Sequence, residues 1–202
     1  MIPEFLTRYY VAGENPFTSL NDLALAEANV IKMRASDKYD WGGFYAQDDY
    51  LVHRREIEQW IRSQMREKGG KPVDDVPVYM FLGDVNGQFD KFGADTVSLQ
   101  IPLADLDLSA VSFAWPDSMY EMVVDENGNF TGEGTRTNTP RVYMHDELSI
   151  AVDCVARFQA ACGKDAFSGV PVEAQVWDRS MLQRWYGERS FASLRMTGER
   201  IV

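Results

Sequence analysis

Alternation and clustering of apolar residues predict five strands along the chain. Runs rich in aromatic and β-branched residues predict strands at 5–11, 76–83, 95–103, 110–115 and 172–178. The run at 76–83 is apolar without interruption, as is typical of a strand buried on both faces. Between 119 and 131, Asn127-Gly128 predicts a hairpin turn.

Apolar residues at helical spacing predict four helices. The first follows the capping residues Asn21 and Asp22 and runs to about Arg34 with Val30 and Ile31 on its apolar stripe. The second runs from Tyr50 to Lys68 and ends at Gly69-Gly70, with Glu58 and Arg62 as an i to i+4 pair on its outer side. The other two run from 147 to 161, after a cap at Asp146, and from Asp178 through Trp185. The weak pattern of the tail at 187–202 predicts a mobile end.

Strands and helices alternate irregularly, without a repeating βαβ unit. This order predicts an α+β fold with a mixed, largely antiparallel sheet and about four helices. A length of 202 residues suits a single globular domain over 1–202, and the sequence contains no repeat or linker that would divide it.

The charge balance restricts the partners. Lys and Arg total 20 and Asp and Glu total 31, which gives a formal net charge of −11 and repels phosphate backbones and anionic lipid. General nucleic-acid binding and membrane association are therefore not expected. The start of the chain does not resemble a signal peptide, and Cys154 and Cys162 lie about 12 Å apart on one predicted helix, so we expect reduced thiols and a cytoplasmic location.

Short motifs for cofactors are absent. The chain contains neither a dinucleotide nor a P-loop glycine pattern, no CxxC or HExxH, and no GxSxG elbow. We therefore predict no cofactor and no metal site.

The strand at 172–178, VEAQVWD, raises the main functional question. Val172, Ala174 and Val176 form an apolar face, so Glu173, Gln175 and Trp177 lie together on the other face. A row made of a carboxylate, an amide and an indole is either solvated surface or a binding site.

A second candidate is the basic cluster of the long helix. Arg54 and Arg55 stand near Arg62, Arg66, Lys68 and Lys71 in an otherwise acidic chain. The cluster is either a solvated surface that pairs with the chain's own carboxylates or a site for one phosphate-bearing small molecule or an acidic partner.

Glu173 and two other residues weakly resemble the R-S-E group of ADP-ribosyltransferases. The matching positions are Arg8 in FLTRYYV, Ser98 in Thr96-Val-Ser98, and Glu173 itself. The resemblance implies NAD as cosubstrate, with the arginine holding the diphosphate, the serine near the ribose and the glutamate stabilising an oxocarbenium-like centre. The family usually carries its glutamate second in an E/Q-x-E pair, whereas Gln175 stands there in this chain.

The order of KGGKP, VYMFLG, VSFAWPDSM and VEAQVWD resembles a family of uncharacterised bacterial cytosolic proteins from about Phe5 to Leu182. That resemblance implies a single bacterial domain and no catalytic residue. Within VSFAWPDSM, Asp117 and Ser118 follow Pro116 at the end of a strand, where they either cap a proline turn or contribute to a site.

These observations leave three classes of function. The first is a binding or interaction protein that meets a basic protein through its acidic surface or binds a phosphate-bearing molecule. The second is an enzyme that acts on a nucleotide such as NAD with Arg8, Ser98 and Glu173. The third is a scaffold subunit with exposed aromatic anchors. The absence of catalytic motifs favours the first class.

Overall fold

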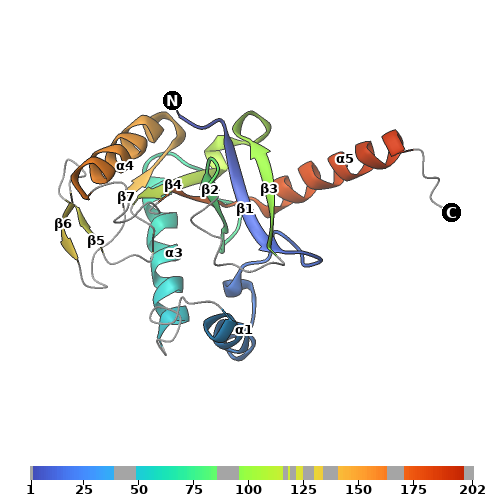
Figure 1. Ribbon diagram of the computed structural model, residues 1–202, viewed down its shortest axis with the longest axis horizontal. Helices are drawn as coiled ribbons and strands as arrows, with labels where there is room; N and C mark the ends of the chain where they lie inside the picture. The colour runs from blue at the N-terminus through green and yellow to red at the C-terminus, as the bar shows by residue number, and fades with distance from the viewer. Residues whose placement is uncertain are drawn as a thin grey trace.

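The structure of the chain is a computed structural model, which describes residues 2–38, 49–85, 96–115, 118, 122–124, 130–133, 141–162 and 171–197 (Figure 1). Its described helices are α1 (Leu25–Lys38), α3 (Tyr50–Glu67), α4 (Leu148–Cys162) and α5 (Arg179–Thr197). Its strands are β1 (Phe5–Val11), β2 (Val78–Leu82), β3 (Thr96–Pro102), β4 (Val111–Trp115), β5 (Met122–Val124), β6 (Phe130–Glu133), β7 (Arg141–Tyr143) and β8 (Glu173–Val176). The predicted α+β fold is confirmed.

Six strands form one sheet in the order β3-β1-β2-β8-β4-β7. Every pairing that the described residues make in it is antiparallel, so the mixed character expected from the sequence is not seen there. Strand β8, the last in sequence, lies between β2 and β4 near the middle of the sheet. The predicted hairpin is present as the antiparallel pair β5 and β6, whose turn lies outside the described residues.

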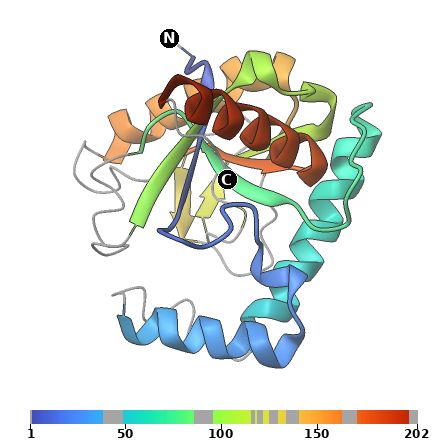
Figure 2. The same ribbon diagram turned by 90° about the vertical axis from the view of Figure 1, so that its right-hand side faces the viewer.

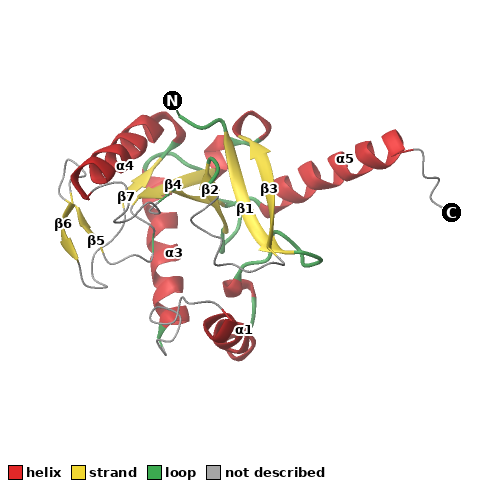
Figure 3. Cartoon of the chain, in the orientation of Figure 1, coloured by secondary structure: helices red, strands yellow, loops and turns green. Residues whose placement is uncertain are grey.

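Helices cover both faces of the sheet (Figure 3). On one face, α4 and the beginning of α5 pack against the apolar side chains of β2, β4 and β8, including Met80, Phe113 and Ala174. On the other face lies α3, whose buried Ile57, Ile61 and Met65 belong to a second cluster. The two layers follow from the strand register, since Ala174 pairs with Met80 and Phe113 and its neighbours in sequence point the opposite way.

Helix α1 and strand β7 differ from the sequence-based expectations. Helix α1 begins at Leu25 instead of Asn21 or Asp22, because residues 20–22 form a separate 3-10 turn in which Asp22 accepts a hydrogen bond from the Ser19 amide (2.6 Å). Its Leu25, Val30 and Ile31 are exposed, so the predicted stripe is not buried. Strand β7 was not predicted.

Helix α5 is longer than expected. Asp178 caps it as predicted, accepting from the Met181 amide (3.0 Å), but the helix continues past Trp185 to Thr197. One glycine inside a helix costs roughly 1 kcal/mol, and the good helix formers that follow Gly187 outweigh that cost. Figures 1 and 2 show α5 extending away from the sheet toward the C-terminus.

Among the described residues, no helix combines the length and the apolar character needed to cross a membrane.

Candidate functional site

The polar row of β8 is not a solvated surface. Glu173 is 7% exposed, and Gln175 and Trp177 are fully buried on the face of the sheet that α3 covers. The Trp177 indole donates to Ser112 Oγ (2.8 Å), Ser112 Oγ donates to Gln175 Oε1 (3.0 Å), and Gln175 Nε2 donates to Glu173 Oε2 (3.0 Å). The same Glu173 oxygen accepts from the Ser118 amide (3.1 Å). The row is therefore a chain of hydrogen bonds inside the protein.

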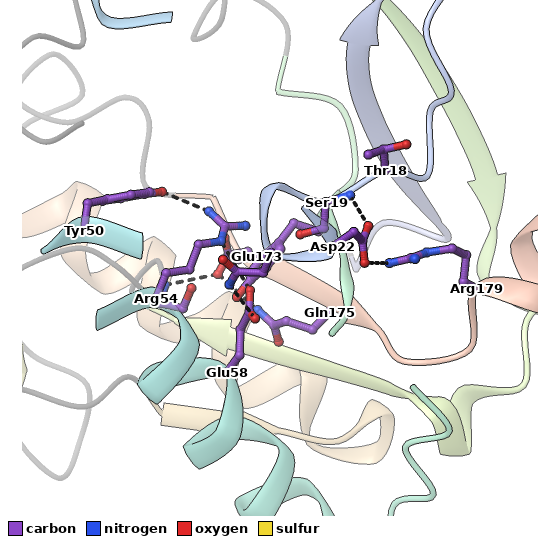
Figure 4. Close-up of polar contacts among 12 residues, drawn as sticks. Thr18, Ser19, Asp22, Tyr50, Arg54, Glu58, Glu173, Gln175 and Arg179 are labelled. Carbon is purple, nitrogen blue, oxygen red and sulfur yellow. Dashed lines mark hydrogen bonds and ion pairs between the residues drawn. The ribbon is translucent and has the colours of Figure 1, made fainter. Parts of the chain in front are cut away.

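A second buried carboxylate faces this row from α3 (Figure 4). Glu58 is 2% exposed; its Oε2 accepts from Asn21 Nδ2 (2.7 Å) and its Oε1 from Arg54 Nε (3.2 Å). Arg54 also donates to the Tyr50 hydroxyl (2.9 Å). Burial raises the pKa of Glu58, and the Arg54 charge and the Asn21 hydrogen bond offset only part of that increase.

Glu58 corrects one prediction. The sequence pattern paired it with Arg62 on the outer side of the helix, whereas Arg62 binds Asp75 (3.0 Å) and Glu58 is buried with Arg54. Helix geometry explains the difference. Glu58 follows Leu51 by seven residues, which is about two turns, so it lies on the same buried face of α3 as Leu51. That position inside an apolar stripe was the available signal for a buried glutamate.

Tyr79 lies between the two carboxylates. It pairs with Gln175 across β2 and β8, and the Arg54 guanidinium lies 4.2 Å from the centre of its ring. Burial holds the pKa of Tyr79 well above its usual range, and the charges of Glu58 and Glu173 raise it further. The Tyr79 hydroxyl therefore keeps its proton and is available as a hydrogen-bond donor.

Several polar atoms around this cluster have no hydrogen-bond partner. They are Ser19 Oγ, Asn21 Oδ1, Tyr79 Oη and Ser118 Oγ, and a fifth such atom among the described side chains is Arg179 Nε. The Tyr79 hydroxyl is close enough to the Glu58 carboxylate and the Ser118 hydroxyl to affect the pKa of Glu58 and its own pKa. Neither contact has the geometry of a hydrogen bond. Buried polar atoms rarely lack partners, so four in one cluster mark it as unusual.

A cavity of about 300 Å³ opens beside the cluster. Its walls include Arg8 and Tyr10 of β1, Thr18 and Ser19 of the following loop, Arg54 of α3 and Tyr79 of β2. β1 and β2 pair at Leu6 and Thr7, and the cavity lies against the residues that follow on β1, from Arg8 to Val11.

Arg8 spans the gap where β1 and β2 separate. Its guanidinium donates to the carbonyl oxygens of Pro16 (2.8 Å), Tyr79 (2.9 Å) and Thr18 (3.1 Å). These three carbonyl groups hold the Arg8 guanidinium in one orientation on the cavity wall.

The structure brings together some of the residues proposed from the sequence and separates others. Arg8, Arg54, Glu173, Gln175 and Ser118 lie in or around the cluster, and Trp177 joins it through Ser112. Arg55 lies on another side of α3, lining a different groove. Asp117 lies outside the described residues.

Ser98 does not join Arg8 and Glu173. It is exposed on β3 and pairs with Tyr9, and two strands lie between β3 and β8. Three strand spacings amount to about 14 Å across the sheet. The R-S-E arrangement suggested by the sequence is thus not assembled around one point.

Sequence reasoning missed Ser19, Asn21, Glu58 and Tyr79. Tyr79 and Ser19 carried no signal of their own, because a tyrosine in an apolar strand and a serine in a loop are ordinary.

Among the described residues, no group of three metal-ligating side chains occurs.

Comparison with known proteins identifies no relative: no family model, no curated protein and no solved structure matches the chain. The resemblances noted in the sequence therefore remain predictions.

Proposed function

We propose that this protein binds a small phosphate-bearing molecule in the cavity between β1, β2 and α3. The observation that carries the proposal is that Ser19 and Tyr79, whose buried hydroxyls have no hydrogen-bond partner, line a cavity that also contains Arg8 and Arg54.

The unpartnered hydroxyls support a ligand because they cost stability in its absence. A buried polar group without a hydrogen bond destabilises the folded state by roughly 1–3 kcal/mol. Ser19 and Tyr79 are 6% and 7% exposed, so the surrounding protein shields them from bulk water. A ligand that offers oxygen atoms to the Tyr79 and Ser19 hydroxyls would replace the missing bonds.

The charges favour a phosphate group. Guanidinium groups match phosphate oxygens in geometry, and two of them, from Arg8 and Arg54, line this cavity. Thr18 and Ser19 add hydroxyl donors, and Tyr10 adds an aromatic wall. The exposed Glu14 on the cavity wall is an opposing charge. The volume is at the small end of the range of roughly 300–1,000 Å³ for ligand pockets, which fits one small molecule.

The carboxylates support binding more than catalysis. Neither Glu58 nor Glu173 lines the cavity; Glu58 holds Arg54, and Glu173 binds Gln175 and the Ser118 amide. Both act behind the wall, where they position the side chains that a ligand would touch. An NAD-dependent transferase would need its glutamate in contact with the substrate.

A basic protein partner is the alternative within the same class. Only the net charge of −11 supports it, and a net charge gives no location for the partner. The cavity is the more specific observation, so the small-molecule proposal is preferred.

The test is a thermal-shift titration with inorganic phosphate, AMP, ADP-ribose and NAD, on the parent protein and on Tyr79→Phe and Ser19→Ala. We expect a phosphate-bearing compound to raise the melting temperature of the parent, because a ligand that binds only the folded state stabilises it by mass action. Both variants should show a smaller shift.

The variants also separate function from stability. Without ligand, Tyr79→Phe should be as stable as the parent or more so, since it removes a hydroxyl that has no partner. The control is Tyr143→Phe, another buried tyrosine, which lies in the core on the opposite face of the sheet. Its ligand response should match the parent. No shift with any phosphate compound, or an equal loss of shift in Tyr143→Phe, would refute the proposal.

A further inference from the structure

A groove of about 490 Å³ runs along α3 on a different side from the cavity, and three arginines line it. Arg55, Arg62 and Arg66 are spaced by seven and four residues. At 3.6 residues per turn these positions fall within about 40° of one another around the helix axis. The three guanidinium groups therefore extend from one stripe of α3 beside the segment that contains Asp75.

These arginines are only partly engaged within the protein. Arg55 donates to the Leu23 carbonyl (3.3 Å), and Arg62 donates to the Asp74 carbonyl (3.0 Å) and pairs with Asp75. The Asp75 side chain is 89% exposed, and an ion pair with so exposed a partner contributes little stability. Within the described part of the chain, the Arg66 guanidinium forms no hydrogen bond or ion pair.

We propose that this groove binds a short acidic peptide segment of a partner protein. The three arginines outnumber the two carboxylates on the groove walls, those of Glu58 and Asp75, and the net positive charge complements such a segment. Gln59 and Ser63 add polar groups between the arginines. The groove has its own arginines and no lining residue in common with the small-molecule cavity; Glu58, which lines the groove, reaches the cavity only through its ion pair with Arg54.

The length of the stripe favours a peptide over a single phosphate. From Arg55 to Arg66 the helix rises about 16 Å, which matches about five residues of extended peptide. One phosphate would reach two of the arginines at most.

The net charge favours a short peptide over nucleic acid. A chain with a net charge of −11 repels a long polyanion along most of its surface. A segment with a few carboxylates meets only the groove.

Fluorescence anisotropy with a fluorescein-labelled hexaglutamate peptide tests this proposal. The parent protein should bind the peptide at low salt and lose affinity as salt rises. The double variant Arg62→Ala/Arg66→Ala should bind about tenfold more weakly, because it removes two charges from the groove.

Lys68→Ala is the matched control. It removes one positive charge at the same end of α3, but Lys68 pairs with Glu147 and does not line the groove. Its affinity for the peptide should stay within about twofold of the parent, because Lys68 does not line the groove and an exposed ion pair such as Lys68–Glu147 contributes little.

Three results would overturn the proposal. The first is no binding of the peptide at low salt. The second is an equal loss of affinity in Lys68→Ala and the double variant, which would show a general charge effect. The third is tighter binding of tripolyphosphate or a single-stranded oligonucleotide than of the peptide in competition, which would exclude a peptide as the occupant.

Discussion

Glu58 provides the sharpest test of the buried cluster, because two substitutions at this position separate its shape from its charge. Glu58→Ala removes the acceptor of both Asn21 and Arg54. The Arg54 side chain is only 14% exposed, so the variant removes the Glu58 carboxylate from beside a mostly buried charge. Breaking a buried ion pair in this way costs about 3–5 kcal/mol. For a chain of this length, roughly 2–4 °C per kcal/mol predicts a melting temperature about 6–20 °C lower.

Glu58→Gln should be far less damaging. The glutamine oxygen can still accept one of the two hydrogen bonds. Asn21 Oδ1 has no partner, so rotation of the Asn21 amide would let it accept from the new amide group. We expect Glu58→Gln to cost less than Glu58→Ala near neutral pH, because its amide keeps hydrogen bonds to Arg54 and Asn21, although Arg54 loses its counter-charge in both variants.

The decisive measurement compares how the free energy of unfolding depends on pH in the parent and in Glu58→Gln. Burial raises the pKa of Glu58 above its ordinary value of 4.5, so the folded protein holds this proton more tightly than the unfolded chain. The bound proton contributes fully to the stability of the folded state below pH 4.5. This contribution is lost as the pH rises through the raised pKa of Glu58. Between the two pKa values, the parent should lose up to about 1.4 kcal/mol per pH unit relative to Glu58→Gln.

Urea denaturation of both proteins at a series of pH values measures this difference. Glu56→Gln, an exposed glutamate two residues earlier on the same helix, is the control and should follow the parent at every pH. If the stabilities of the parent and Glu58→Gln ran parallel from pH 4 to pH 8, Glu58 would titrate alike in the folded and unfolded states. Such a result would refute the burial of Glu58 beside Arg54 and Asn21.

Two further substitutions test the sheet around the cluster. Gln175→Leu should lower the free energy of unfolding by about 1–3 kcal/mol in urea denaturation, because it leaves the buried Ser112 hydroxyl and Glu173 short of a partner; an unchanged midpoint would show that the hydrogen-bond chain contributes nothing. Gly83→Ala should lower the free energy of unfolding by at least about 1 kcal/mol, because Gly83 has a φ of 77° and a Cβ there would lie 2.8 Å from the Pro3 side chain. Gly13 also has a positive φ but has open space around it, so Gly13→Ala should cost less. Thermal denaturation of both variants measures the difference.

The strands and helices could be predicted because each carries its own pattern. The apolar run at 76–83 contains β2, and the stripe of Leu51, Ile57 and Met65 identifies α3, whatever their surroundings. Where a signal was weak, the boundary was wrong: Gly187 does not end α5, and the capping residues Asn21 and Asp22 belong to a separate turn. Short-range pattern therefore accounts for most of the fold.

The candidate site depends on tertiary packing, which no local pattern contains. Glu173 and Gln175 were identified as a polar row, but their role depends on α3 lying over them and on Glu58 facing the same space. Ser98 was proposed with Arg8 and Glu173 because strand order is not visible in the sequence; the insertion of β1 and β2 between β3 and β8 separates it from the site. Tyr79 is a candidate because its buried hydroxyl has no partner, which only the tertiary structure shows.

The composition of the cluster is itself an argument that it serves binding. A protein selected only for stability would place an apolar side chain such as phenylalanine at Tyr79, because the hydroxyl has no partner and costs free energy when buried. Functional sites commonly retain such costs, and substitutions that remove them stabilise the protein while weakening its activity. Unchanged or higher stability together with a weaker ligand response in Tyr79→Phe is the pattern that the binding proposal requires. Lower stability without ligand would instead show that the hydroxyl helps to hold α3 against the sheet.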